Sequence, residues 1–338
     1  MKIFLTGHRG YIGNVLNYML EKQNFEVIGC DSDFYPQGFI QTEKSKTISL
    51  KKDIRDIQIE DLEGCFAVLH LAALSNDPLG ELNSELTNDI NFLATIRLAN
   101  IAKKAGVERF IYSSSCSTYG VNTDVVTEDS PLEPLTAYAK SKVDSEKELL
   151  KIEDETFSSV ILRNATAYGI SASQRLDIVV NNLTCSAFTT GKVKLMSDGT
   201  AWRPLIHVED MANAFIACLK SKKERVSGQI FNVGSNDENF SVRAIAETVE
   251  SIIPNSKLTY SENANKDSRS YKVNFDKIKN QLKFKTKWTL KDGIKQIYEV
   301  IKKKEFSEKD FQDKKFYRVA YIKWLIENSI IDKDLRFN

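Results

Sequence analysis

Short apolar strands alternate with helical patterns through the first half of the chain. The first strand ends at Leu5, and a helical pattern runs from Val15 to Lys22. Polar turn residues bound the later apolar runs, and amphipathic stretches of helical length separate them. This alternation predicts an α/β fold with a doubly wound parallel sheet, whose ligands bind beyond the C-terminal strand ends. Further strands are expected at 26–30, 66–71, 109–113 and 160–163, and helices at 85–105 and 136–152.

The alternation of strands and helices becomes less regular after residue 165, which indicates a second, smaller unit. The run Phe231–Gly234 resembles one more strand returning to the sheet, and the charged tail contains an aromatic-rich helical stretch from Phe316 to Ile326. We expect the tail to pack against the fold rather than carry chemistry. The expected division is a Rossmann-type domain at 1–165 to which 203–234 returns, a C-terminal substrate-binding lobe at 166–202 and 235–304, and a helical tail at 305–338.

Charge and cysteine usage exclude several classes of protein. The chain has 338 residues, 47 of them Lys or Arg and 46 Asp or Glu, for a formal net charge of +1. Nucleic-acid and membrane-surface binders need a basic excess, so neither partner is expected. The longest apolar stretch, 66–74, is too short to span a bilayer. The spacing of five cysteines and three histidines favours neither disulfides nor a metal site, and the absence of a signal-like segment after Met1 predicts a cytoplasmic protein.

A glycine-rich turn, TGHRGYIG, joins the first strand to the first helix. Gly7 allows the tight turn, Gly10 lets a pyrophosphate approach the backbone, and Gly13 permits close packing of helix against strand. The helix N-terminus offers free N–H groups to the phosphates. Asp31 ends the next strand, 18 residues after Gly13, where it can accept hydrogen bonds from an adenosine ribose and repel a 2′-phosphate. The turn predicts a dinucleotide site that favours NAD over NADP, although Arg9 could hold that phosphate.

A tyrosine and a lysine share one face of the helix predicted at 136–152. Tyr138 and Lys142 are four residues apart, and Ser115 lies at the end of a Ser-rich strand, 23 residues before Tyr138. A phenol that works as a general base near pH 7 needs its pKa lowered by about 3 units, which a nearby ammonium and a bound cationic nicotinamide both favour. The same spacing recurs away from the strand ends at Tyr18/Lys22 and Tyr298/Lys302, which we interpret as solvated helix faces.

Seven motifs in a fixed order now suggest a family. The chain resembles an extended short-chain dehydrogenase/reductase of the NAD-dependent epimerase/dehydratase family, which acts on nucleotide sugars, over about residues 1–300. The resemblance implies NAD as cofactor, a nucleotide-diphosphate sugar as substrate, and a homodimer formed through the helices at 85–105 and 136–152. The motifs that carry it are TGHRGYIG, Asp31, DIRD (Asp53 to Asp56), HLAA (His70 to Ala73), SSSCSTYG (Ser113 to Gly120), YAKSK (Tyr138 to Lys142) and RPLIHVED (Arg203 to Asp210).

The resemblance also implies roles for individual residues. The implied catalytic set is Ser115, Tyr138 and Lys142. Substrate contacts are implied at Ser115, Thr166, Asn181 or Asn182, Arg203 and Arg269, where guanidinium groups suit a diphosphate. Contacts to NAD are implied at Gly7, Gly10, Tyr11, Ile12, Gly13, Asp31, Asp53, Ile54, Leu71, Ala72, Ala73, Asn91, Ser113, Ser114, Tyr138, Lys142, Asn164 and Ala165.

Departures from the family pattern indicate the subtype. Sugar 4,6-dehydratases of this family carry Thr-Asp-Glu where this chain has Ser115-Cys116-Ser117, so dehydration is disfavoured. Thr166 replaces an Asn that contacts substrate in many members. We interpret Cys116 as a small buried filler and give His70 and His207 structural roles.

The leading hypothesis is an NAD-dependent nucleotide-sugar 4-epimerase that works through a transient 4-keto sugar. The alternative is a net C4 dehydrogenase or 4-ketoreductase acting on a heptose or deoxyhexose, because 162–169 and 175–181 resemble members that handle less common sugars. A remote alternative is a non-catalytic dinucleotide-binding protein on the same fold. That third class usually loses the Tyr or the Lys, and here both are present.

Overall fold

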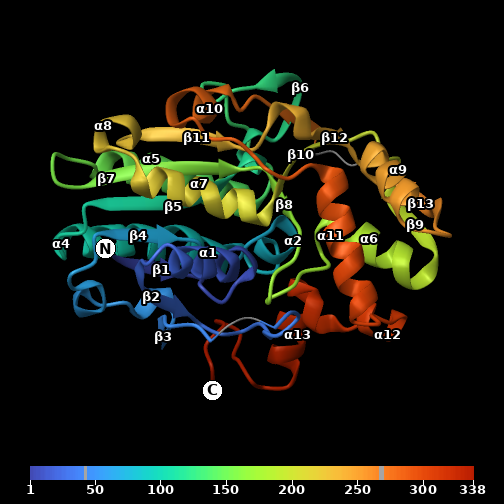
Figure 1. The fold of residues 1–338 in the computed structure, drawn as a ribbon. Helices are drawn as coiled ribbons and strands as arrows, with labels where there is room; N and C mark the ends of the chain where they lie inside the picture. Colours follow the sequence, from blue (N-terminus) through green and yellow to red (C-terminus); the bar gives the residue numbers. More distant parts are fainter. Residues whose placement is uncertain (42–43, 266–269) are drawn as a thin grey trace.

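A seven-stranded sheet forms the centre of the molecule (Figure 1). The computed structural model describes residues 1–41, 44–265 and 270–338. All six strand pairings in this sheet are parallel, which confirms the predicted doubly wound α/β architecture. In spatial order the strands are β11 (Gln229–Val233), β7 (Ser158–Asn164), β5 (Arg109–Ser115), β4 (Ala67–His70), β1 (Lys2–Thr6), β2 (Glu26–Asp31) and β3 (Ile48–Lys51).

Alternate residues of each central strand face opposite layers of helices. Ile3 and Leu5 belong to one buried cluster, whereas Phe4 between them belongs to the cluster on the other face, and all three are fully buried. Burial on both faces explains why these strands read as continuous apolar runs. The first face is covered by α1 (Tyr11–Lys22) and α7 (Val208–Lys220), and the second by α4 (Ala94–Lys104) and α5 (Ala137–Ile152).

The smaller lobe lies beyond the C-terminal ends of the central strands and has its own apolar core. Residues 203–234 are shared between the two parts, because β10 pairs in a small separate sheet while β11 returns to the large one. The lobe contains the three-stranded sheet β12 (Asn239–Ser241), β10 (Trp202–His207) and β8 (Thr166–Tyr168), the pair β9 (Lys192–Ser197) and β13 (Lys257–Asn265), and the helices α6 (Val179–Thr190), α9 (Val242–Ile252) and α11 (Leu290–Lys303).

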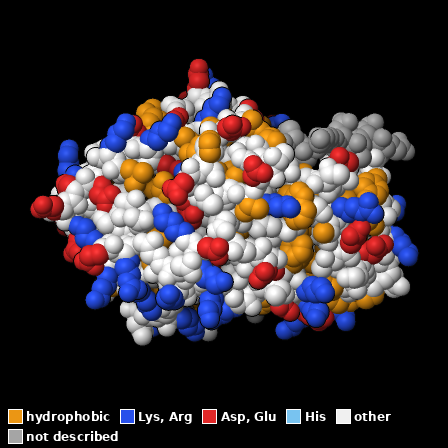
Figure 2. Space-filling model, turned by 90° about the horizontal axis from the view of Figure 1, so that it is seen from above, with side chains coloured by type: hydrophobic (Ala, Val, Ile, Leu, Met, Phe, Trp, Pro, Cys, Tyr) orange, Lys and Arg blue, Asp and Glu red, His pale blue; other side chains and the backbone are white. Residues whose placement is uncertain are grey.

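Charged residues of both signs are mixed on the surface. Figure 2 shows Lys and Arg interspersed with Asp and Glu over the face seen from above. Within the described residues, no helix is long and apolar enough to cross a membrane.

Short elements connect the layers of the fold. The remaining elements are β6 (Val121–Val126) paired with β14 (Ser270–Val273), the helices α2 (Asp77–Gly80), α3 (Ser84–Asn88), α8 (Lys223–Val226), α10 (Asp276–Leu282), α12 (Glu308–Phe311) and α13 (Arg318–Glu327), and the single turns η1 (Ile54–Asp56), η2 (Ile59–Leu62), η3 (Asp89–Leu93), η4 (Cys116–Tyr119), η5 (Asn236–Glu238) and η6 (Lys314–Phe316).

The C-terminal tail packs against both parts of the molecule: Phe306 and Phe316 belong to the apolar core of the smaller lobe, and the later residues pack against the large domain. Ile322 and Leu325 of α13, and Ile331 and Leu335 after it, are buried in the same cluster as α4 and the second face of the sheet. The tail ends beside β3, so the C-terminus lies near an edge strand that belongs to the first fifty residues (Figure 1).

A buried ion pair fastens α5 to two central strands. The Arg163 Nη2 atom lies 2.7 Å from Glu146 Oε2, and each side chain is only 3% exposed. The Ser114 hydroxyl also donates to Glu146, while Arg163 Nη1 donates to the Tyr119 hydroxyl at 3.0 Å. Both charges are therefore compensated inside the protein, as buried charges must be.

Removing one partner of this pair should destabilise the fold strongly. We expect Glu146→Ala to lower the free energy of unfolding by roughly 3–5 kcal/mol, because the Arg163 charge would stay buried without its partner. Denaturant unfolding measures the loss. Glu247→Ala, which breaks an exposed i,i+4 pair with Arg243, is the control and should cost no more than about 1 kcal/mol. Equal losses in the two variants would contradict the proposed role of Glu146.

Candidate active site

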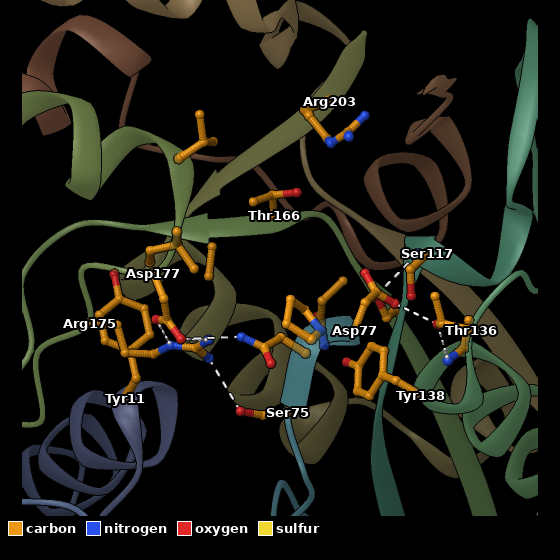
Figure 3. Close-up of a pocket in the computed structure, with 18 of the residues that line it drawn as sticks. Tyr11, Ser75, Asp77, Ser117, Thr136, Tyr138, Thr166, Arg175, Asp177 and Arg203 are labelled. Atoms are coloured by element: carbon orange, nitrogen blue, oxygen red, sulfur yellow. Dashed lines mark hydrogen bonds and ion pairs between the residues drawn. The ribbon is translucent and has the colours of Figure 1, made fainter. Parts of the chain in front are cut away.

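A cavity of about 1100 Å³ lies between the C-terminal strand ends and the smaller lobe (Figure 3). The predicted site residues that do not line it are Gly7, Gly10, Gly13, Asp31, Asp53, Ile54, Ala72, Asn91 and Asn181, while Arg269 is outside the described residues. The predicted residues that line it are Tyr11, Ile12, Leu71, Ala73, Ser113, Ser114, Ser115, Tyr138, Lys142, Asn164, Ala165, Thr166, Asn182 and Arg203.

The glycine-rich turn has the geometry that a pyrophosphate needs. Gly7 has a φ of +70°, and a Cβ at Gly13 would lie 1.9 Å from the Gly7 carbonyl oxygen, so neither position tolerates a side chain. Gly10 precedes α1, whose N-terminus has no side-chain cap and no acidic residue in its first turn. These N–H groups and the helix dipole are thus available to an anionic ligand. The turn fits a dinucleotide phosphate.

Carboxylates gather where β2 and β3 end, next to this turn. Asp31 accepts hydrogen bonds from the backbone N–H groups of Arg9 and Asp33. The Arg9 guanidinium is paired with Asp33 at 2.6 Å, so this arginine is already engaged and is less suited to hold a 2′-phosphate. Asp53, just beyond β3, caps the following turn and pairs with Arg55 at 2.8 Å. We call this region the adenosine corner, and its acidic character suits NAD better than NADP.

Three predicted catalytic side chains meet at the end of β5 and the start of α5. The Lys142 ammonium donates to the Ser113 carbonyl at 2.8 Å and lies 5.6 Å from the centre of the Tyr138 ring. Thr136 caps the N-terminus of α5 by accepting from the Ala139 N–H, which sets where the first turn begins. Tyr138 faces the cavity (Figure 3), and Ser115 lines it as well.

Burial dominates the titration of this group. Burial raises the pKa of Tyr138 to about 12, the Asp77 carboxylate adds to that rise, and hydrogen bonding with Ser115 opposes it. Burial likewise lowers the pKa of Lys142 to about 7, against the attraction of Glu146. A cation bound beside the phenol would bring the pKa of Tyr138 back toward neutrality. The site therefore fits a positively charged ring such as an oxidised nicotinamide.

Two asparagines at the strand ends have different roles. Asn164 donates to the Ser113 hydroxyl and the Ser114 carbonyl, and its buried Oδ1 has no partner, so it can accept a hydrogen bond from a bound ligand. Asn91 instead holds the loop after β4, because its side chain bonds both the N–H and the carbonyl of Leu74. The same amide also donates to the Ser141 hydroxyl, and Asn91 does not line the cavity, so its contact with NAD stays a prediction.

The substrate side of the cavity is formed by the smaller lobe. Thr166 and Arg203 lie across the cavity from Tyr138 (Figure 3). Of the two candidate asparagines only Asn182 lines it. Asn181 is fully buried, and it accepts from the Gly169 N–H and donates to the Gly169 carbonyl, so it holds the loop beside the cavity.

Several cavity residues were missed by the sequence reasoning. Arg175 pairs with Asp177 at 2.8 Å and donates to the Ser75 hydroxyl at 3.2 Å, and Asp77 accepts from Thr136 at 2.6 Å (Figure 3). The loop that carries Ser75 and Asp77 directly follows HLAA, which was the available signal. The tail also contributes to the wall, through Tyr317, Val319, Ala320 and Lys323.

Other singled-out residues are structural. Each ring nitrogen of His70 is hydrogen-bonded to a threonine hydroxyl, and burial lowers its pKa to about 3, so it stays neutral. His207 stacks on Trp288 at 4.1 Å between ring centres, and burial lowers its pKa to about 4. Cys116 is 1% exposed, with its thiol directed to the Arg163 carbonyl, and burial raises its pKa.

Known proteins resemble this chain over most of its length. UDP-glucose 4-epimerase of Corynebacterium glutamicum is 30% identical over 267 residues, covering 73% of this chain and 79% of the relative. The dTDP-D-glucose 4,6-dehydratase of Homo sapiens is 27% identical over 321 residues, covering 88% and 89%. The solved structure of MoeE5 in complex with UDP-glucose and NAD superposes with a TM-score of 0.79 at 25% identity, covering 90% of this chain and all of that one. Residues 3–234 match the NAD dependent epimerase/dehydratase family, and the chain belongs to this family.

Proposed function

We propose that the protein is a nucleotide-sugar 4-epimerase that uses bound NAD and a transient 4-keto sugar. The observation that carries this is the grouping of Ser115, Tyr138 and Lys142 at the strand-end wall of a cavity that extends into the smaller lobe. The similar proteins include UDP-glucose 4-epimerases as well as a 4,6-dehydratase, and the MoeE5 structure holds UDP-glucose with NAD.

Each side chain has a definite task in this mechanism. The glycine-rich turn and the strand ends would hold NAD, which would supply a reversible acceptor for the hydride of sugar C4. The Tyr138 phenolate removes the proton of the C4 hydroxyl, and its phenol gives a proton back when the alcohol re-forms. Ser115 orients the same hydroxyl by hydrogen bonding, and the Lys142 cation favours the phenolate. Between the two hydride transfers the keto sugar turns its other face toward the wall.

The nucleotide diphosphate would lie on the side of the smaller lobe. Arg203 offers a guanidinium for phosphate oxygens, with Asn182 and Thr166 as hydrogen-bonding groups nearby on the same wall. Lys194 of β9 also lines this side. Arg269 remains a proposed further phosphate ligand.

Dehydration is disfavoured by the residues that follow Ser115. The 4,6-dehydratase pattern needs an acid and a base for loss of the C6 hydroxyl, and Cys116 and Ser117 stand at those positions. Cys116 is buried away from the cavity, and Ser117 lines it with an unionised hydroxyl. We therefore expect no 4-keto-6-deoxy product.

We also propose a cytoplasmic homodimer. The five buried, unpaired cysteines suit a reducing compartment. The adjacent helices α4 and α5 would form the dimer interface. Sedimentation equilibrium of the protein tests that assembly, and a monomer at micromolar concentration would contradict it.

The first experiment is proton NMR in D₂O with catalytic enzyme, no added cofactor, and a panel of UDP-, dTDP- and GDP-sugars. We expect a new anomeric signal that reaches equilibrium with its substrate, because recycled cofactor permits many turnovers. A keto sugar formed in an amount equal to enzyme, with the cofactor left reduced, would instead identify the C4 dehydrogenase. Cofactor binding without chemistry on any sugar would favour the non-catalytic alternative.

Removing the phenol should separate chemistry from binding. We expect Tyr138→Phe to lower turnover a hundredfold or more while NAD still binds, since a positioned general base is lost. Tyr18→Phe is a matched control, because Lys22 lies 5.3 Å from the Tyr18 ring centre in the same i,i+4 arrangement outside the cavity. Near-normal turnover by Tyr138→Phe would refute the assignment.

The negative charge of Asp77 should affect the pH dependence of turnover. Its carboxylate raises the pKa of Tyr138, so Asp77→Asn should lower that pKa, and activity that needs the phenolate should begin at a lower pH. We expect a shift of up to about one pH unit, because the cavity is open to water. Asp144→Asn, on the exposed face of α5, is the control and should leave the profile unchanged. A shift to higher pH would contradict the electrostatic role of Asp77.

A further inference from the structure

The last residues of the chain contact the adenosine corner directly. Arg336 forms an ion pair with Asp56 and lies 3.4 Å from the Asp53 carboxylate. Arg55, which pairs with Asp53, donates to the Asp334 carbonyl at 2.9 Å. The tail therefore touches the turn after β3, where the resemblance implies contacts to NAD.

An aromatic contact reaches the other side of the same corner. The Phe337 ring lies 5.5 Å from the ring of Phe34, which follows Asp31 by three residues. Lys51, at the end of β3, places its ammonium 4.2 Å from the centre of the Phe337 ring. The tail thus bridges the two strand ends, β2 and β3, that flank the predicted adenosine position.

The other end of the tail lies at the main cavity. Arg318 is buried, stacks over Tyr35 at 3.8 Å and donates to Ser173, so the start of α13 is firmly anchored. One turn further along, Ala320 and Lys323 line the cavity itself. Since the order of neighbouring strands is β5-β4-β1-β2-β3, the tail spans the row of strand ends from the cavity to the corner.

We propose that residues 317–338 form a strap that closes over the dinucleotide and retains NAD between turnovers. The anchored part is α13, whose Ile322 and Leu325 are buried in the core of the large domain. The releasable part is 328–338, because Arg336 is 35% exposed, Asp56 is 51% exposed and Phe337 is 41% exposed. Opening the corner requires breaking these surface contacts and also withdrawing Ile331 and Leu335, which are buried against the large domain, so the closed position is strongly favoured.

Retention has a chemical purpose under the proposed function, on which this inference rests. The hydride taken in the first half of the reaction must be returned in the second. Loss of the reduced cofactor between the two would leave a keto sugar and an inactive enzyme. A strap that makes cofactor release slow compared with sugar turnover prevents that outcome.

The test measures cofactor release and requires no sugar, so it stands even if the proposed reaction is wrong. Purified protein, loaded with NAD where it is isolated without it, is diluted, and free NAD is assayed over time. We expect release at least tenfold faster from a chain ending at Ser329, and several-fold faster from Arg336→Ala and from Phe337→Ala. Arg243→Ala, which removes an exposed arginine of α9, should release NAD at the wild-type rate. Unchanged or slower release from folded truncated protein would overturn the proposal.

A charge exchange separates the strap from a general loss of structure. Arg336→Asp should speed release, and the double variant Arg336→Asp with Asp56→Arg should restore part of the retention, because the ion pair is rebuilt in reverse. High salt should speed release from the wild type and have little effect on the truncated chain. Tighter NAD binding after truncation would show that the tail competes for the corner, which would also overturn the proposal.

Discussion

One buried carboxylate determines where α5 lies. Glu146 forms an ion pair with Arg163 of β7 and accepts a hydrogen bond from the Ser114 hydroxyl of β5. On α5 it lies one turn after Lys142. Lys142 is bonded to the end of β5 through the Ser113 carbonyl, so the helix is attached to the sheet at two successive turns. Tyr138, one turn earlier, owes its place at the cavity wall to these attachments.

The two sides of the cavity supply different kinds of groups. The sheet side supplies backbone turns and a few buried polar groups, and its geometry follows from regular secondary structure. The side of the smaller lobe supplies Arg203 and Asn182 from β10 and α6, and the loop beyond β8 adds Arg175. Residues of the lobe can therefore vary without disturbing α5 and the strand ends.

Local patterns allowed prediction of the sheet, the glycine turn and the Tyr138 helix, since each depends on neighbouring residues along the chain. Contacts over long sequence separations could not be predicted. Asn181 and Asn182 are adjacent, and only the packing of α6 decides that the first is buried and the second faces the cavity. Likewise, no periodicity in the tail reveals that Lys323 lies at the cavity wall, because that position depends on how α13 docks against distant strands.

The positions of the two chain ends have a practical consequence. Met1 precedes the central strand β1 and is exposed at the N-terminal end of that strand, away from the cavity, whereas Asn338 follows Phe337 directly beside the adenosine corner. An affinity tag or fusion partner joined to the N-terminus would extend into solvent away from the ligand sites. A tag at the C-terminus would be attached to the residues that contact β2 and β3. Recombinant forms of this enzyme should therefore carry the tag at the N-terminus.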